Sequence, residues 1–284
     1  MLSVSLARTR EMARGKQVVR FNPLEAEVLD RAAGLVVSAC KAVFGPDVIC
    51  VTLKGSAVKG DFIPGYSDLD FHIFLRPNVM DGENVPKAEH AVRFQRVFGH
   101  IDPEDFDVSQ FQIYFINSEK YPKDWAPPVQ GTYKVLWGSL PETAKEPDEP
   151  AYIRFAEQHL SLPNIEYSRR SIVGRFVDKP DSRIASIVRL LGASLKNYMY
   201  SVSVLITRDP RIAFGLKLDK MIDLVEEEIG SAGHFRGFYE YISDWQRIRQ
   251  DPECARQALK EGIQALDEIA RWRRNQLTSP SGIL

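Results

Sequence analysis

Two aspartates and a Gly-Ser pair are the residues of this 284-residue chain whose types and spacing best suit chemistry. Gly55 and Ser56 follow an apolar run at 48–53, and Asp68 and Asp70 open a second apolar run. Because side chains on a strand alternate between its faces, the two aspartates project the same way, about 7 Å apart along the backbone. Two carboxylates beside a Gly-Ser turn predict oxygen ligands for magnesium next to a phosphate-binding turn. We interpret the stretch as a nucleotide site.

The residues around this stretch predict the helices and strands of an α+β domain. Apolar residues at helical spacing predict a helix over 24–44, which Gly45 and Pro46 end. A second helix is predicted at 86–99. Apolar runs and period-two alternation predict strands at 48–53, 68–75, 108–116 and 132–137. We expect this domain to cover 1–145, with a loosely ordered arm at 1–21.

The second half of the chain has the pattern of an all-α helical bundle, which we expect to form a separate domain over 146–284. A connection rich in Pro, Glu and Asp, 141–150, precedes it and is predicted to be a linker. The longest predicted helix spans 181–207. We expect Trp137 to pack at the junction of the two domains. The predicted helices begin at Ala151, Asp181, Pro210, His234 and Pro252.

Charged residues of the bundle allow two interpretations. Arg183, Arg189 and Lys196 recur at roughly helical intervals, so they can line a cleft between the domains or lie on a solvated helix face. The solvated face is the favoured interpretation. The acidic run 226–228 is expected to face solvent.

Composition and charge exclude several classes of protein. A hydrophobic fraction of 44% suffices for buried cores, and no window approaches the apolar length of a membrane span. Neither half carries the basic excess expected of a protein that holds long nucleic acid. The three cysteines are odd in number and widely spaced, which suggests reduced thiols. We therefore expect a soluble, cytoplasmic protein without a membrane partner.

The Gly-Ser and Asp-x-Asp stretch resembles the signature of the DNA polymerase beta-type nucleotidyltransferase superfamily. It is most similar to that of the streptomycin and spectinomycin aminoglycoside adenylyltransferases, over about 51–76. The resemblance implies a nucleotidyltransferase-type mixed sheet with flanking helices, followed by a helical bundle. It also implies transfer of AMP from ATP to a hydroxyl of a small molecule, such as an aminoglycoside, with release of pyrophosphate. The matching residues are Gly55, Ser56, Ala57, Val58, Gly60, Pro64, Ser67, Asp68, Leu69 and Asp70.

The resemblance also implies a role for each side chain. Asp68 and Asp70 would hold one or two Mg²⁺ ions, which neutralise phosphate charge and align the α-phosphate for attack. The Ser56 hydroxyl and nearby backbone N–H groups would hold the β- and γ-phosphates. The expected nucleotide-binding residues are Gly55, Ser56, Lys59 and Ser67. Lys54 and Lys59 flank the turn, and each either meets phosphate oxygens or is a solvated loop lysine.

Gln112 departs from the pattern. Members of this superfamily normally have a third carboxylate on a neighbouring strand, which completes metal binding and often acts as the general base, and Gln112 stands at the matching position. Glutamine cannot take up a proton and brings one negative charge fewer. Another residue then acts as base, or transfer is slow, or the fold binds a nucleotide without transferring it, as a regulatory module. Transfer to RNA or to a protein side chain is a further possibility.

Four residues are candidates for a substitute base. His72 shares the strand face of the two aspartates, although a packed histidine is the favoured interpretation. Asp107 has the opposite parity to Gln112 on a regular strand. Glu166 and Asp178 can reach the site only from the helical half. The sequence does not choose among them.

Overall fold

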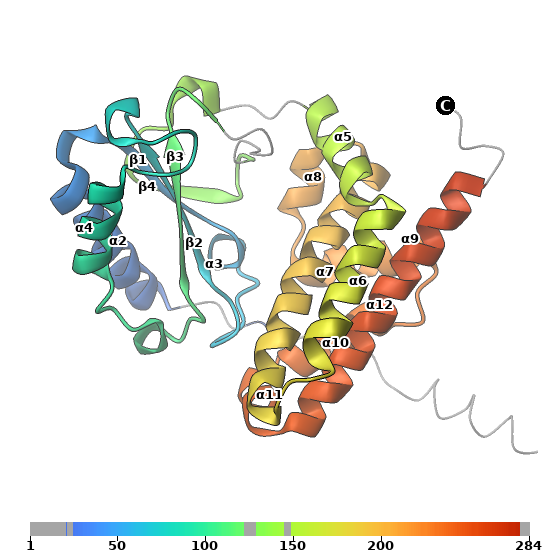
Figure 1. The fold of residues 1–284 in the computed structure, drawn as a ribbon. Helices are drawn as coiled ribbons and strands as arrows, with labels where there is room; N and C mark the ends of the chain where they lie inside the picture. Colours follow the sequence, from blue (N-terminus) through green and yellow to red (C-terminus); the bar gives the residue numbers. More distant parts are fainter. Residues whose placement is uncertain (1–20, 22–24, 122–128, 145–148, 279–284) are drawn as a thin grey trace, which may run out of the picture.

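The computed structural model describes residues 21, 25–121, 129–144 and 149–278. The predicted arm at 1–21 lies outside this part of the chain except for Phe21. An α+β region comes first and a helical region follows (Figure 1). The helices and strands of the first region are α2 (Ala26–Phe44), β1 (Val48–Lys54), α3 (Ser56–Lys59), β2 (Leu69–Leu75), α4 (Ala88–Phe98), β3 (Phe111–Asn117) and β4 (Tyr133–Gly138).

A four-stranded mixed sheet organises the first region, with the strand order β3-β2-β1-β4. β1 pairs antiparallel with β2 and β4, whereas β2 and β3 run parallel and are joined through α4. The parallel register places Asp70 opposite Gln112, and the antiparallel register places Lys54 opposite Asp70. Three polar residues from three adjacent strands therefore meet at one end of the sheet.

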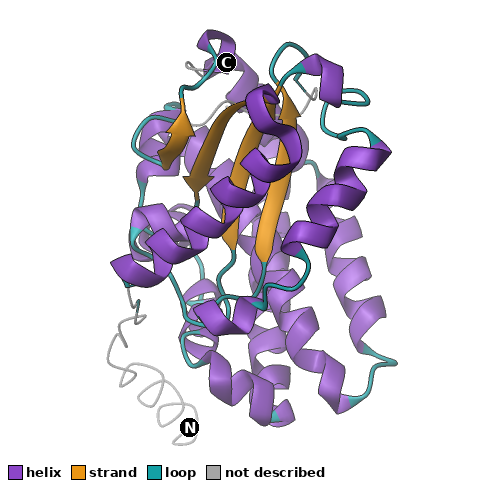
Figure 2. Cartoon of the chain, turned by 90° about the vertical axis from the view of Figure 1, so that its left-hand side faces the viewer, coloured by secondary structure: helices purple, strands orange, loops and turns teal. Residues whose placement is uncertain are grey.

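β1 and β2, the two central strands, are rich in apolar residues, so both faces of these strands can be buried. β1 and β2 are almost wholly buried, as expected for apolar runs in the middle of a covered sheet. α2 and α4 lie over one face of the sheet (Figure 2). Their apolar residues join those of the strands in one core that includes Val36, Val51 and Phe71. This core fixes the strand ends that carry Asp68 and Asp70.

The helical region has its own core, centred on α7. That core contains Leu191, Tyr198, Phe238 and Leu266, and of the sheet region's fully buried residues only Ile63 joins it within the described chain. α7 packs most extensively against α5, α6, α8, α9 and α12. The helices are α5 (Glu149–His159), α6 (Leu162–Phe176), α7 (Ile184–Thr207), α8 (Pro210–Gly215), α9 (Leu218–Ile229), α10 (His234–Ile242), α11 (Trp245–Gln250) and α12 (Pro252–Thr278).

The α+β class, the four strands and the helical second half are confirmed by the structure. Strand three begins at Phe111 rather than at 108, because Asp107 adopts a left-handed conformation (φ 52°) that ends a short 3₁₀ turn. Helices α6, α9 and α11 were not predicted. The domain boundary at 145 and part of the predicted linker fall on residues 145–148, outside the described chain.

Two expectations about individual residues were wrong. Trp137 does not pack at the junction: it belongs to the core of the sheet region, and Lys41 of α2 lies over its ring at 5.0 Å. The expectation for the acidic run is wrong for Glu226, which is half-buried, whereas Glu227 and Glu228 are exposed as expected. Glu226 accepts a hydrogen bond from the backbone N–H of Arg236 at the start of α10 (2.9 Å), and Glu228 accepts one from the indole of Trp272 (3.2 Å). Among the described helices, none combines the length and apolar character needed to cross a membrane.

Candidate active site

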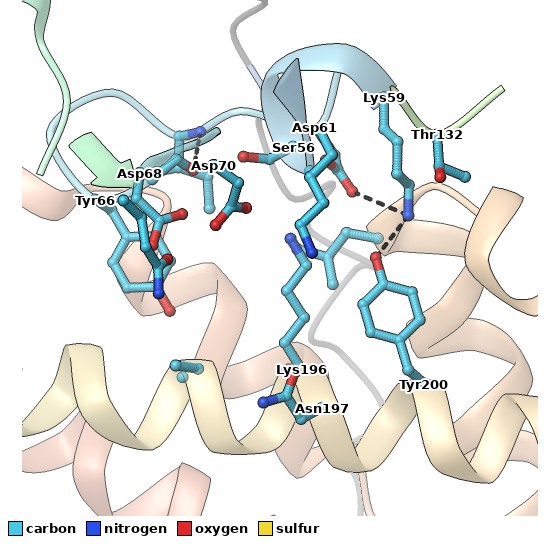
Figure 3. Close-up of a pocket in the computed structure, with 18 of the residues that line it drawn as sticks. Ser56, Lys59, Asp61, Tyr66, Asp68, Asp70, Thr132, Lys196, Asn197 and Tyr200 are labelled. Atoms are coloured by element: carbon cyan, nitrogen blue, oxygen red, sulfur yellow. Dashed lines mark hydrogen bonds and ion pairs between the residues drawn. The ribbon is translucent and has the colours of Figure 1, made fainter. Parts of the chain in front are cut away.

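A cleft of about 350 Å³ lies between the end of the sheet and α7. One wall is formed by β1, α3, the loop before β2, and the neighbouring ends of β2 and β3. The other is formed mainly by α7, with contributions from α8, α9 and α10. Figure 3 shows side chains from both walls pointing into the same space. All of the residues predicted to act on metal or nucleotide, Gly55, Ser56, Lys59, Ser67, Asp68, Asp70 and Gln112, line this cleft.

Asp68 and Asp70 both face the cleft from the start of β2. Gly55 makes room for Asp70: it has φ +84°, and a Cβ atom at this position would lie 2.5 Å from Asp70 Oδ2. Only glycine meets both requirements without strain. Burial and the neighbouring charge of Asp68 raise the pKa of Asp70 to about 6, and the ammonium of Lys54 opposes this shift. The two carboxylates therefore repel one another in a partly dry environment.

Gln112 bridges the two aspartates. The oxygen and nitrogen of a glutamine amide are assigned from their hydrogen-bond partners. In the orientation that satisfies every partner, Nε2 donates to Asp68 Oδ2 (2.8 Å) and to Asp70 Oδ1 (2.9 Å), and Oε1 accepts from the Tyr114 hydroxyl. Gln112 thus occupies the predicted position and supplies hydrogen-bond donors in place of a negative charge.

The two carboxylates fit a magnesium site that is completed by a phosphate. Magnesium uses one or two protein carboxylates and fills its other positions with water and phosphate oxygens. A divalent cation between Asp68 and Asp70 would also relieve the repulsion that raises the pKa of Asp70. Within the described residues, no cluster of three or more His, Cys, Asp and Glu side chains is arranged to hold a metal by itself.

The turn after β1 carries Ser56 and Lys59 into the cleft. Ser56 is buried at the start of α3, directly after Gly55. The side chain of Lys59 is only 5% exposed: its Nζ donates to the Tyr200 hydroxyl at 2.8 Å and lies 3.9 Å from Asp61 Oδ2. The solvated alternative for Lys59 is therefore wrong. Ser67 uses its hydroxyl to accept from the Ile63 N–H (2.9 Å), so it holds the shape of the loop.

Lys54 is also a cleft residue rather than a solvated one. Its Nζ lies over the Tyr114 ring at 5.8 Å. Burial lowers the pKa of Lys54, and the charges of Asp70 and Asp68 counteract that shift. Lys54 is the nearest cation to the aspartate pair along the strand register.

α7 supplies the opposite wall of the cleft, although its charged residues were expected to lie on a solvated face. Arg189 and Lys196 line the cleft, so the solvated-face interpretation is wrong for both, while Arg183 is exposed as expected. Burial alone would lower the pKa of Lys196, but Tyr200, Asp61 and Asp70 reverse the effect and raise it. Figure 3 shows Lys196 reaching from α7 across the cleft toward the sheet side. Lys196 therefore brings a positive charge from the helical region to the predicted phosphate site.

A close approach holds the two walls together. Gly192 of α7 lies against Tyr66, so that an added Cβ would be 1.9 Å from the Tyr66 hydroxyl. The Tyr66 ring packs edge-on against Trp245 at 5.1 Å. A signal for this wall exists in the sequence, because the two charged residues of α7 recur along one face together with small and polar residues. These residues are Arg189, Gly192, Ala193, Lys196, Asn197 and Tyr200.

None of the four candidates for a substitute base lines the cleft. His72 is buried edge-on against Tyr114 at 5.3 Å, and burial and the charge of Lys54 lower its pKa. Asp107 lies behind the loop, where its carbonyl accepts from Gly65 N–H (2.7 Å). Glu166 pairs with Arg274 and Asp178 with Lys179 on the surface of the helical region. Glu166 and Asp178 do not reach across.

Two comparisons with known proteins found no match. No protein-family model matches the chain, and neither does any curated protein.

Proposed function

We propose that the chain is a nucleotidyltransferase of the DNA polymerase beta type, which transfers AMP from ATP to an oxygen atom of a small acceptor. One observation carries the proposal: Asp68 and Asp70 lie in the same cleft as the Gly55-Ser56 turn, with Gln112 in register opposite Asp70. The mixed sheet and the helical region that follows it agree with the layout that the sequence resemblance implies.

The positions of the side chains suggest which of them would bind the metal and which the phosphates. Asp68 and Asp70 would hold Mg²⁺, which when bound neutralises phosphate charge and favours in-line attack at the α-phosphorus. Ser56 follows Gly55, which lies against Asp70, and Lys59 lies beside Asp61 and Tyr200. Ser56 and Lys59 would both bind the β- and γ-phosphates. Lys196, from α7, would add a charge to these phosphates. Residues from both regions would thus orient one triphosphate.

A second candidate function rests on Gln112. Its amide donates hydrogen bonds to both aspartates, and it cannot take up a proton from the molecule that receives AMP. Such a site suits a protein that binds a nucleotide and magnesium without transferring the nucleotide, as a regulatory module would. The two candidates share the nucleotide and differ in turnover.

Binding and turnover of ATP test the proposal without a known acceptor. We expect magnesium-dependent binding of ATP by calorimetry and slow formation of AMP and pyrophosphate, with water as acceptor. Asp68→Asn should lower that rate at least about 100-fold, since it removes a charge that acts on the transferring phosphate. The matched control is Asp178→Asn, which removes an exposed carboxylate. If ATP binding depends neither on magnesium nor on Asp68, the assignment of the nucleotide site to this cleft is refuted.

Gln112→Glu separates the two candidates. If the wild-type chain forms AMP, the regulatory-module candidate is excluded. If the wild type binds ATP and magnesium but forms no AMP, while Gln112→Glu does, the regulatory module is the better description of the natural chain.

A further inference from the structure

Arg189 of α7 lines the cleft. It lies one helical turn before Gly192, which contacts the Tyr66 hydroxyl. Figure 3 shows Tyr66 beside Asp68 and away from Lys59, so this turn of α7 lies at the aspartate end of the cleft. Within the described part of the chain Arg189 makes no hydrogen bond or ion pair. An unpaired guanidinium that lines a cleft is suited to binding a carboxylate or a phosphate.

Among the described residues that line the same end of the cleft, there is no histidine and no carboxylate besides Asp68 and Asp70. Among the described residues that line it, Gln112 and Arg189 cannot act as bases at neutral pH. Tyr66 is held between Gly192 and Trp245, and the Tyr114 hydroxyl donates to Gln112, so neither is placed to take a proton. Asp68 and Asp70 are the carboxylates proposed to hold the metal. Asp61, the remaining carboxylate of the cleft, lies beside Lys59 at the other end.

The charge of the whole cleft points the same way. Four cationic side chains, Lys54, Lys59, Arg189 and Lys196, and three carboxylates, Asp61, Asp68 and Asp70, line it within the described chain. Bound magnesium would offset the carboxylates further. The triphosphate of ATP is strongly negative and would be faced by magnesium, Lys54, Lys59 and Lys196, so Arg189 is the cation of this set that remains to attract an anionic acceptor.

We infer that the acceptor attacks through an oxyanion that is already ionised at neutral pH, a carboxylate or a phosphate monoester, and that Arg189 binds this acceptor. The inference rests on the proposed nucleotidyl transfer. The acceptor oxygen forms a bond to the α-phosphorus, the bond from that phosphorus to the bridging oxygen of the β-phosphate breaks, and pyrophosphate leaves with the electron pair. No proton moves in this step. A glutamine at position 112 is therefore sufficient, because no general base is needed.

Three one-ring probes test the inference on the full chain. The chain is first saturated with magnesium and an ATP analogue whose α- and β-phosphorus atoms are joined by a methylene group. Calorimetry then measures the binding of benzoate, phenyl phosphate and benzyl alcohol, which share a ring and differ in the reacting group. We expect at least one of the two anions to bind about tenfold or more tightly than benzyl alcohol, as a charged hydrogen bond allows. Which anion binds better identifies the source of the oxyanion.

Variants of two arginines link that preference to the cleft. Arg189→Met should abolish the preference for the anion, and Arg189→Lys should retain part of it. Arg183→Met is the matched control, because Arg183 precedes the same helix and is exposed. The inference is overturned if benzyl alcohol binds as tightly as both anions, or if Arg189→Met keeps the preference for the anion. Neither result contradicts the proposed nucleotidyl transfer. Failure of the nucleotide analogue itself to bind with magnesium refutes the proposed function instead.

Discussion

The two walls of the cleft are built in different ways. The sheet wall takes Gly55, Ser56, Asp68 and Asp70 from within 16 consecutive residues, which run from the end of β1 through α3 to the start of β2. The α7 wall takes its charges from one face of a helix whose other face fills the core of the helical region. Local sequence therefore shapes the first wall, whereas the packing of the helices positions the second. The comparison predicts that substitutions in the sheet wall displace a carboxylate, whereas substitutions in the α7 wall remove a charge or weaken the packing of the helices.

The largest expected effect is on the sheet wall. Gly55→Ala should lower AMP formation from ATP by about 100-fold or more, because the new Cβ meets Asp70 Oδ2 and displaces the carboxylate. Gly60→Ala is a matched control: it has a similar positive φ of +76°, but nothing lies within 4 Å of an added Cβ. Both variants strain the backbone, and only the first should abolish activity. Equal activity in the two would mean that the position of Asp70 does not matter.

A smaller effect is expected from the helical wall. Lys196→Met should raise the KM for ATP and lower kcat/KM by about 10- to 100-fold, the value of one hydrogen bond to a charged group. The fold should be retained, since methionine fills most of the same volume. Lys220→Met, on the exposed face of α9, is the control. If both lysine variants match the wild type in steady-state kinetics, α7 contributes no charge to the nucleotide site.

The contact between the walls predicts a change in stability. Gly192→Ala should lower the free energy of unfolding by about 1–3 kcal/mol, because the Tyr66 hydroxyl would overlap the new methyl and the ring cannot withdraw from Trp245. Gly174→Ala on α6 has nothing within 4 Å of the added Cβ, and should instead stabilise the helix by about 0.5–1 kcal/mol. Urea denaturation of both variants measures the difference. Destabilisation of equal size in the two would contradict a specific contact at Gly192.

The smallest expected effect concerns pH and the helical region alone. Burial lowers the pKa of His159, whose Nδ1 lies 2.9 Å from Ser201 Oγ. In the unfolded chain the histidine titrates near its ordinary value of 6.5. Below that pH the unfolded chain binds a proton more readily than the native chain, so the free energy of unfolding decreases as the pH falls.

His159→Gln should therefore have a shallower loss of stability than the wild type between pH 6.5 and pH 5, and the same pH dependence above pH 7. Thermal denaturation across this range provides the measurement. An identical slope in both chains would show that His159 is not the group responsible.

The sequence predicted one wall and missed the other for a physical reason. Strand alternation and the glycine turn are local rules, so residues 55–70 indicated both the fold around Asp68 and Asp70 and their direction. The direction of Arg189 and Lys196 depends on which face of α7 the other helices cover, and α6 and α9 were not predicted. Without them, a charged stripe on a helix is indistinguishable from a solvated face. The bridge from Gln112 to both aspartates required the strand register as well.

The hydrogen bond between Lys59 and Tyr200 joins residues 141 positions apart. During synthesis, the motif at 55–70 leaves the ribosome long before α7 is complete. A nascent or truncated chain that ends before residue 189 therefore carries the signature residues but lacks the cations of α7, Arg189 and Lys196. We expect such a fragment to be inert toward nucleotides, so that any activity begins only when both halves of the protein have been made.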